Sequence, residues 1–188
     1  MAEKVYVIGA DMIRFGRFED ESPPSLAAKA ALLALDDCNL GIKDIQAVYS
    51  GNCGETMVGQ RMLQIIGQTG VPVVNVTNAC ATGASAFREA WMAIRAGVCD
   101  TALAVGSEKM AKGVLVRKNR AGDAVPREGL VGSETMPAVF AEMGVEHSRR
   151  YGTTLEQFAM VSVKNHFHST MNPKAMYQKE TPLPEVLG

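Results

Sequence analysis

A short apolar run that leads into a helix of small residues constrains the fold of this chain more than any other feature. The run 71–76 is rich in β-branched residues and carries one polar residue, Asn75, which predicts a strand covered on both faces. The segment 82–96 predicts a helix that is small-sided almost all round, and such a helix is expected to be buried. A leucine at Gly83 or Ala84 would then overpack its surroundings.

Strands and helices alternate along the first hundred residues. The pattern predicts strands at 5–9, 45–49, 71–76 and 101–105. It predicts helices from Ser22-Pro23-Pro24-Ser25 to the vicinity of Gly41, around 61–66, and over 82–96. Because strands that alternate with helices are typical of layered folds, the sequence predicts an α/β layered fold for residues 1–108.

The chain changes character after Ser107. The segment 109–132 contains five glycines or prolines and the basic residues Lys109, Lys112, Arg117, Lys118, Arg120 and Arg127. A loop of this length in a compact domain is usually functional or disordered. Two helices are predicted next, at 136–150 and 154–169, with Thr153/Glu156 or Thr154/Gln157 as a capping box for the second. We therefore divide the chain into an α/β core, residues 1–108, and a mainly helical loop region, residues 109–188.

Composition excludes several classes of function. The 188 residues carry a net charge of −1, which gives no general electrostatic reason to expect nucleic acid or an anionic membrane as a partner. No apolar run reaches the roughly 18 residues of a membrane span, and the N-terminus lacks the pattern of a signal peptide. The four cysteines have no zinc-site spacing, so we expect reduced thiols, no bound metal and a cytoplasmic location.

Cys80 stands between the predicted strand 71–76 and the predicted helix 82–96. A thiol at a helix N-terminus faces unpaired backbone N–H groups and the positive end of the helix dipole, which favour the nucleophilic thiolate. Small neighbours would let a substrate approach closely. Alternatively, Cys80 only fills a crowded junction, since free cysteine is among the most buried residue types.

Several segments together resemble the thiolase superfamily. The stretch NVTNACATGASAF, from Asn75 to Phe87, resembles its nucleophile loop, and AGVCDTALAVGSEKM resembles the strand that follows, with Gly106, Glu108 and Met110 at its end. The opening VYVIGADMIRFGRF is similar to the first strand of the family. The late segment YGTTLEQFAMVSVKNHFHSTMNPKA resembles the sterol-carrier-protein type of thiolase in particular. The resemblance covers nearly the whole chain, in order.

The resemblance implies a fold, a reaction and a substrate. The fold would be the layered thiolase type, a mixed β-sheet with a buried helix. Cys80 would accept an acyl group as a thioester, in acyl transfer or in thiolytic cleavage of a 3-ketoacyl-CoA. Coenzyme A would be a substrate or product, and no cofactor would be bound permanently. Arg117, Lys118 and Arg120 are the candidates for its phosphate groups, although the basic segment could also be an ordinary solvated loop.

The sequence departs from the family in its second half. Thiolases have two similar halves, and the second supplies the catalytic histidines and another cysteine, but no G-H-P or second C-x-G segment occurs here. His147, His166 and His168 are on the late helices and are expected to be solvated or structural. Cys38 and Cys99 are expected to be structural, while Cys53, in a glycine-rich turn, is left open.

The missing half implies partners. We expect acyl-CoA as ligand, and a homo-oligomer, a complementary thiolase-half chain, or both, with a small OB-fold protein as a further possible partner. Two other functions stay open. One is retro-aldol cleavage of a 3-hydroxyacyl-CoA, which needs no thioester. The other is a non-catalytic subunit that supports a complete partner.

Overall fold

The computed structural model describes residues 4–110 and 135–188. The chain divides into two compact units, Met1–Lys109 and Met110–Gly188, which are described separately. Within the described residues, no helix has both the length and the apolar character that crossing a bilayer requires. The candidate phosphate-binding residues Arg117, Lys118 and Arg120 lie outside the described residues.

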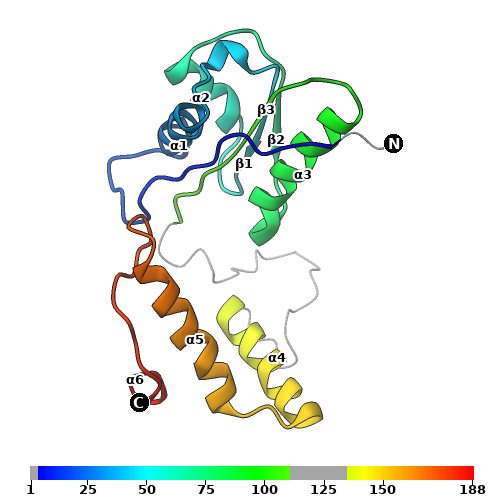
Figure 1. Ribbon diagram of the computed structural model, residues 1–188. Coiled ribbons are helices and arrows are strands. Elements are labelled where there is room, and N and C mark those ends of the chain that lie inside the picture. Colours follow the sequence, from blue (N-terminus) through cyan, green and yellow to red (C-terminus); the bar gives the residue numbers. More distant parts are fainter. Residues whose placement is uncertain (1–3, 111–134) are drawn as a thin grey trace, which may run out of the picture. The chain divides into compact units, whose positions relative to one another are not determined.

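The first unit is built on a parallel sheet of three strands (Figure 1). Strands β1 (Ala47–Gly51), β2 (Val73–Val76) and β3 (Ala102–Gly106) lie in the order β2-β1-β3. Parallel neighbours need crossover connections, and helices α2 (Val58–Ile66) and α3 (Thr82–Arg95) supply them. This confirms the predicted α/β layered fold, although the three described strands are all parallel rather than mixed in direction.

Helices cover both faces of this sheet. Because side chains alternate along a strand, Val48 faces one side of β1 while Ala47 and Tyr49 face the other. Val48 belongs to a core formed with α2 and with α1 (Pro23–Asp37). Ala47 and Tyr49 pack against the alanines of α3. The two core clusters therefore lie on opposite faces of one central strand.

Helix α1 begins where the sequence predicts. The side chain of Ser22 accepts a hydrogen bond from the backbone N–H of Ser25 at 3.3 Å, and two prolines occupy the first helical positions, where proline is tolerated. The helix ends at Asp37, before Gly41. A short 3₁₀ helix, η1 (Ile42–Asp44), then leads into β1.

The strand predicted at 5–9 is absent. Residues 4–11 form no ladder with β3 or with any other described strand, and Tyr6, Val7 and Ile8 are 71%, 64% and 62% exposed. A β-branched run has the propensity for a strand, but it becomes one only where its backbone groups find a partner strand.

The prediction that β2 is covered on both faces is also wrong. The strand lies at the edge of the described sheet, and its four residues are half-buried or exposed. The strand buried at all five positions is β1, in the centre. Two apolar faces indicate a buried strand, but the position in the sheet decides which strand is covered.

Helix α3 buries one side rather than its whole circumference. Thr82, Ala86, Ala90 and Ala93 are buried, whereas Phe87 and Trp91 are 52% and 42% exposed. The expectation of all-round burial is therefore wrong for the described residues. The small residues permit close contact with the sheet on one side only.

Gly59 in α2 is tightly packed, whereas an added Cβ at Gly83 would meet no atom within 4 Å. An added Cβ at Gly59 would lie 2.5 Å from Val73 Cγ1 and 2.9 Å from Ser50 Cβ. We expect Gly59→Ala to lower the free energy of unfolding by about 1–3 kcal/mol. Gly83→Ala is the matched control and should leave stability unchanged or raise it by up to about 1 kcal/mol. Urea unfolding followed by circular dichroism measures both, and equal stabilities would contradict this packing.

The second unit contains the two predicted helices, α4 (Met136–Tyr151) and α5 (Leu155–Thr170). The capping box uses the second predicted pair. The Thr154 hydroxyl accepts from the Gln157 N–H at 3.2 Å, and the Gln157 side chain accepts from the Thr154 N–H at 2.9 Å. A short helix, α6 (Leu183–Leu187), was not predicted, because five residues carry little periodicity.

Candidate functional site

The ends of the three strands meet at one edge of the sheet. In the parallel register, Gly51 at the end of β1 is opposite Val76 of β2 and Gly106 of β3. The residues that follow the strands, 52–54, 77–82 and 107–108, are here called the carboxyl edge. In open α/β sheets, ligands bind outside the carboxyl ends of the strands, so this edge is the first place to look for a site.

Hydrogen bonds join the three segments of the carboxyl edge. The Asn52 side-chain amide donates to the Ser107 carbonyl at 2.6 Å, and the Thr77 hydroxyl donates to the Asn52 carbonyl at 2.7 Å. The backbone N–H of Cys53 donates to the Glu108 carboxylate at 2.8 Å. Each strand end is therefore tied to another by at least one polar contact.

Cys80 lies on this edge, at the entrance to α3. It is the middle residue of a 3₁₀ turn, η2 (Ala79–Ala81), that runs directly into the helix. Its thiol is free and the residue is exposed. The Asn78 side chain donates to the Ser85 hydroxyl at 2.9 Å, which ties the chain before the cysteine to the first turns of α3. The predicted position at a helix N-terminus is thus observed, while the catalytic role stays a prediction.

Cys53 is a second exposed thiol on the carboxyl edge. Its Sγ lies 3.2 Å from the carbonyl oxygen of Ala79, the residue before Cys80. Sequence reasoning left its role open. The sequence signal for Cys53 was its place in a Ser-Gly-Asn-Cys-Gly turn after a predicted strand. That local signal could not show that the turn lies beside the Ala79–Ala81 segment.

The other two cysteines are outside the carboxyl edge. Cys38 follows α1, is half-buried, and its Sγ lies 3.3 Å from the Leu35 carbonyl. Cys99 is buried in the core beneath α3, and burial raises the pKa of its thiol. Both positions agree with the structural roles predicted for them.

We expect iodoacetamide at neutral pH to label Cys80 faster than Cys38 or Cys99. Cys80 is exposed, whereas the raised pKa of Cys99 leaves less of the reactive thiolate at a given pH. The four cysteines fall in separate tryptic peptides, 30–43, 44–61, 62–88 and 96–109, so mass spectrometry measures each rate. Slower labelling of Cys80 than of Cys99 would support the alternative that Cys80 serves packing.

The three histidines all belong to the second unit. His147 Nδ1 lies 2.9 Å from the Thr153 hydroxyl, and its ring contacts Tyr151 with centroids 4.8 Å apart. His166 Nδ1 lies 3.2 Å from the Thr181 hydroxyl. His147 and His168 are exposed and His166 is half-buried, and the solvated or structural roles expected for them stay a prediction. Among the described residues, no group of three His, Cys, Asp or Glu side chains could hold a metal ion.

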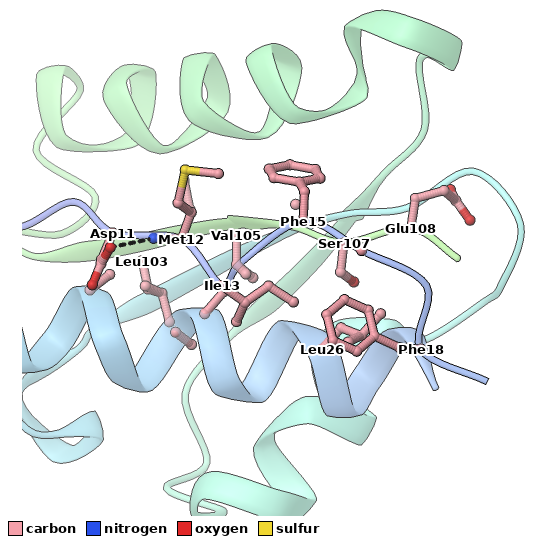
Figure 2. A pocket seen from close by; sticks show the side chains of 16 residues that line it. Asp11, Met12, Ile13, Phe15, Phe18, Leu26, Leu103, Val105, Ser107 and Glu108 are labelled. Atoms are coloured by element: carbon pink, nitrogen blue, oxygen red, sulfur yellow. Dashed lines mark hydrogen bonds between the residues drawn. The ribbon is translucent and has the colours of Figure 1, made fainter. Parts of the chain in front are cut away.

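A cavity of about 210 Å³ lies beside β3 (Figure 2). Its walls are the segment 11–18, α1 and β3, and most of its lining is apolar. In Figure 2, Ile13 and Val105 point toward α1, whereas Met12 and Phe15 point to the opposite side of their segment. Ser107 and Glu108 also line the cavity, but no cysteine does. The cavity therefore touches the carboxyl edge without including its thiols.

Comparison with known proteins gives a consistent family assignment. The family model described as "Thiolase, N-terminal domain" matches residues 5–184. Sterol carrier protein 2 of Bos taurus is 36% identical over 200 residues, which cover 100% of this chain and 37% of that protein. The chain covers between 36% and 50% of the length of other relatives, such as human sterol carrier protein 2 and the acetyl-CoA acetyltransferase of Methanothermobacter thermautotrophicus. The chain thus spans at most half the length of these relatives.

Solved structures share the fold. The chain superimposes on human mitochondrial 3-ketoacyl-CoA thiolase in complex with CoA with a TM-score of 0.70 and 15% identity, covering 97% of this chain and 56% of that one. It superimposes on the Ltp2-ChsH2(DUF35) aldolase with a TM-score of 0.74 and 23% identity, covering 95% and 47%. At these identities the likeness concerns the fold alone.

Proposed function

The chain belongs to the thiolase family, and from this membership we propose that it takes part in acyl transfer on coenzyme A thioesters, with Cys80 as the acyl acceptor. One observation carries the proposal. A free, exposed thiol stands in the turn that enters α3, at the carboxyl edge of a parallel sheet. A nucleophile at such a position is open to substrate and next to the N-terminal amides of a helix.

The proposed chemistry has two half-reactions. The Cys80 thiolate attacks C3, the ketone carbon of a 3-ketoacyl-CoA, and the bond between C2 and C3 breaks. The acyl group stays on Cys80 as a thioester, and the CoA thioester that contains C1 and C2 leaves as an enolate that takes up a proton. The thiolate of free CoA then attacks the acyl-cysteine and releases Cys80. Condensation is the reverse. Each direction needs a base and hydrogen-bond donors for the thioester oxygen and the enolate.

Coenzyme A is the proposed substrate or product. The solved human mitochondrial thiolase contains CoA, which supports this part of the proposal. We propose that Arg117, Lys118 and Arg120 bind its phosphate groups, because guanidinium and ammonium groups donate strong hydrogen bonds to phosphate.

A partner is proposed to complete the site. The chain spans 37% of bovine sterol carrier protein 2, and the sequence offers no recognisable second catalytic segment. The base would therefore come from a complementary half or another chain rather than from His147, His166 or His168. The name of the Ltp2-ChsH2(DUF35) aldolase joins two components, which supports the search for a partner protein.

The direct test is to trap the acyl group. After incubation with acetoacetyl-CoA, intact-mass spectrometry should detect a gain of one acetyl group, and peptide mapping should locate it on Cys80.

The likeness in fold to the Ltp2-ChsH2(DUF35) aldolase supports a second candidate function, retro-aldol cleavage of a 3-hydroxyacyl-CoA. Cleavage of such a substrate without any acyl-cysteine would support it, and a folded chain that changes neither substrate would support the scaffold role.

A further inference from the structure

The residue before Cys80 has an unusual backbone conformation. Ala79 has φ of +45°, in the left-handed region that residues with a Cβ rarely adopt. Such conformations persist only where the surrounding structure enforces them, and they occur at functional sites. We propose that Thr82 is a positioning residue, which holds Ala79 in this conformation and so fixes the direction in which Cys80 is presented.

Hydrogen bonds from Thr82 join both sides of the turn. Its hydroxyl donates to the Ala79 carbonyl at 2.7 Å and accepts from the Asn78 N–H at 2.7 Å. Cys53 Sγ lies 3.0 Å from the same hydroxyl and 3.2 Å from the Ala79 carbonyl. Because the single hydroxyl hydrogen is used in the bond to Ala79, the contact between this hydroxyl and Cys53 needs the S–H as donor, and that one hydrogen is shared between the Thr82 hydroxyl and the Ala79 carbonyl. Thr82 thereby holds the N–H of Asn78 before Ala79 and the carbonyl of Ala79 itself, while the Asn78 carbonyl between them accepts from the Ala81 N–H at 3.0 Å.

Thr82 is itself fixed by packing against the sheet. Its residue exposure is 7%, and a Cβ on Gly51 would lie 2.9 Å from Thr82 Cγ2 and 3.2 Å from its carbonyl oxygen. Only glycine at the end of β1 leaves room for this approach. The hydroxyl therefore has little freedom to move, and it can impose a conformation on the turn rather than follow it.

The consequence for catalysis rests on the proposed function of Cys80, whereas the conformation of the turn does not. If the tie to Thr82 is lost, Ala79 can relax to negative φ. Cys80 then moves relative to the first turn of α3, which changes how its thiol is presented to a reagent or substrate. Alkylation of Cys80 measures this chemically, without any need for acyl transfer.

The test is a set of variants of the full chain, alkylated with iodoacetamide and analysed by the separate tryptic peptides. Thr82→Val removes the hydroxyl at constant shape, and with it the hydrogen bonds to the Ala79 carbonyl and from the Asn78 N–H, so alkylation of Cys80 should slow by roughly tenfold. Thr82→Ser keeps the hydroxyl and should stay within about twofold of the wild-type rate. Ala79→Gly in the Thr82→Val background should restore most of the rate, because glycine adopts positive φ without steric cost.

Thr101→Val is the matched control. The Thr101 hydroxyl also donates to a backbone carbonyl, that of Asp44, at 2.6 Å, but it precedes β3 at the end of the strand away from the carboxyl edge. Its loss should leave the alkylation rate of Cys80 unchanged. If Thr82→Val does not fold, Cys53→Ala removes the other donor to Ala79, and the same glycine rescue applies.

Two outcomes would overturn the inference. One is a folded Thr82→Val protein that alkylates at the wild-type rate. The other is a slowed rate that Ala79→Gly does not restore. In thiolysis of acetoacetyl-CoA, Thr82→Val should lower kcat with little change in KM, since it does not contact substrate in this proposal. The absence of any acyl adduct on Cys80 after incubation with acetoacetyl-CoA, together with the expected alkylation series, would reject the proposed function and keep the positioning role.

Discussion

Replacing Cys80 with alanine should lower acyl transfer by roughly 10³-fold or more, because without the sulfur no thioester can form. The fold should be retained, since Cys80 is exposed and makes no disulfide, so that its truncation leaves no buried cavity. Thiolysis of acetoacetyl-CoA by the chain supplemented with a complementary thiolase half gives the rate, and intact-mass spectrometry reports whether the acyl adduct has disappeared. Both readings should fall together.

Cys38→Ala is the matched control for this experiment. Cys38 is a free cysteine at the end of α1, outside the carboxyl edge, and its removal should leave the rate unchanged. Full turnover by Cys80→Ala would remove the covalent mechanism and favour retro-aldol cleavage. If both variants lose activity together with their folded structure, the cysteines serve the packing of the fold rather than catalysis.

The chain is expected to associate, and its monomer to be inactive. Helix α3 exposes Phe87 and Trp91 at 52% and 42%, and Val98, just beyond the helix, is 73% exposed. Monomers rarely leave such apolar side chains grouped in water. Light scattering after size-exclusion chromatography should therefore give a mass above the 20.1 kDa of one chain. Trp91→Glu should shift the population toward the monomer.

Leu32→Glu provides the control for surface charge. Leu32 is 50% exposed on α1, which covers the opposite face of the sheet from α3, and its replacement should leave the mass unchanged. A stable 20.1 kDa monomer that turns over acetoacetyl-CoA unaided would contradict the prediction. His147, His166 and His168 would then become candidates for the catalytic base.

The sequence alone determined most of the elements, because their signals are local. The periodicity of apolar residues, the capping residues and the glycines that follow each element predicted helices α1, α3, α4 and α5 to within a few residues. The same signals predicted the three strands of the sheet. The capping box at Thr154 depends on residues three apart, so the sequence contained all the information for it. Cys80 at the start of a helix was predictable for the same reason.

The tertiary structure decided what depends on neighbours distant in sequence. Residues 5–9 have strand propensity but no partner strand among the described residues, and β1 rather than β2 is central because the sheet order is β2-β1-β3. Cys53 and Cys80 are 27 positions apart, and only the parallel pairing of Gly51 with Val76 brings their segments together. The strained Ala79 has the same origin. Its conformation depends on a buried Thr82 that is held against the end of β1, a contact that no local pattern encodes.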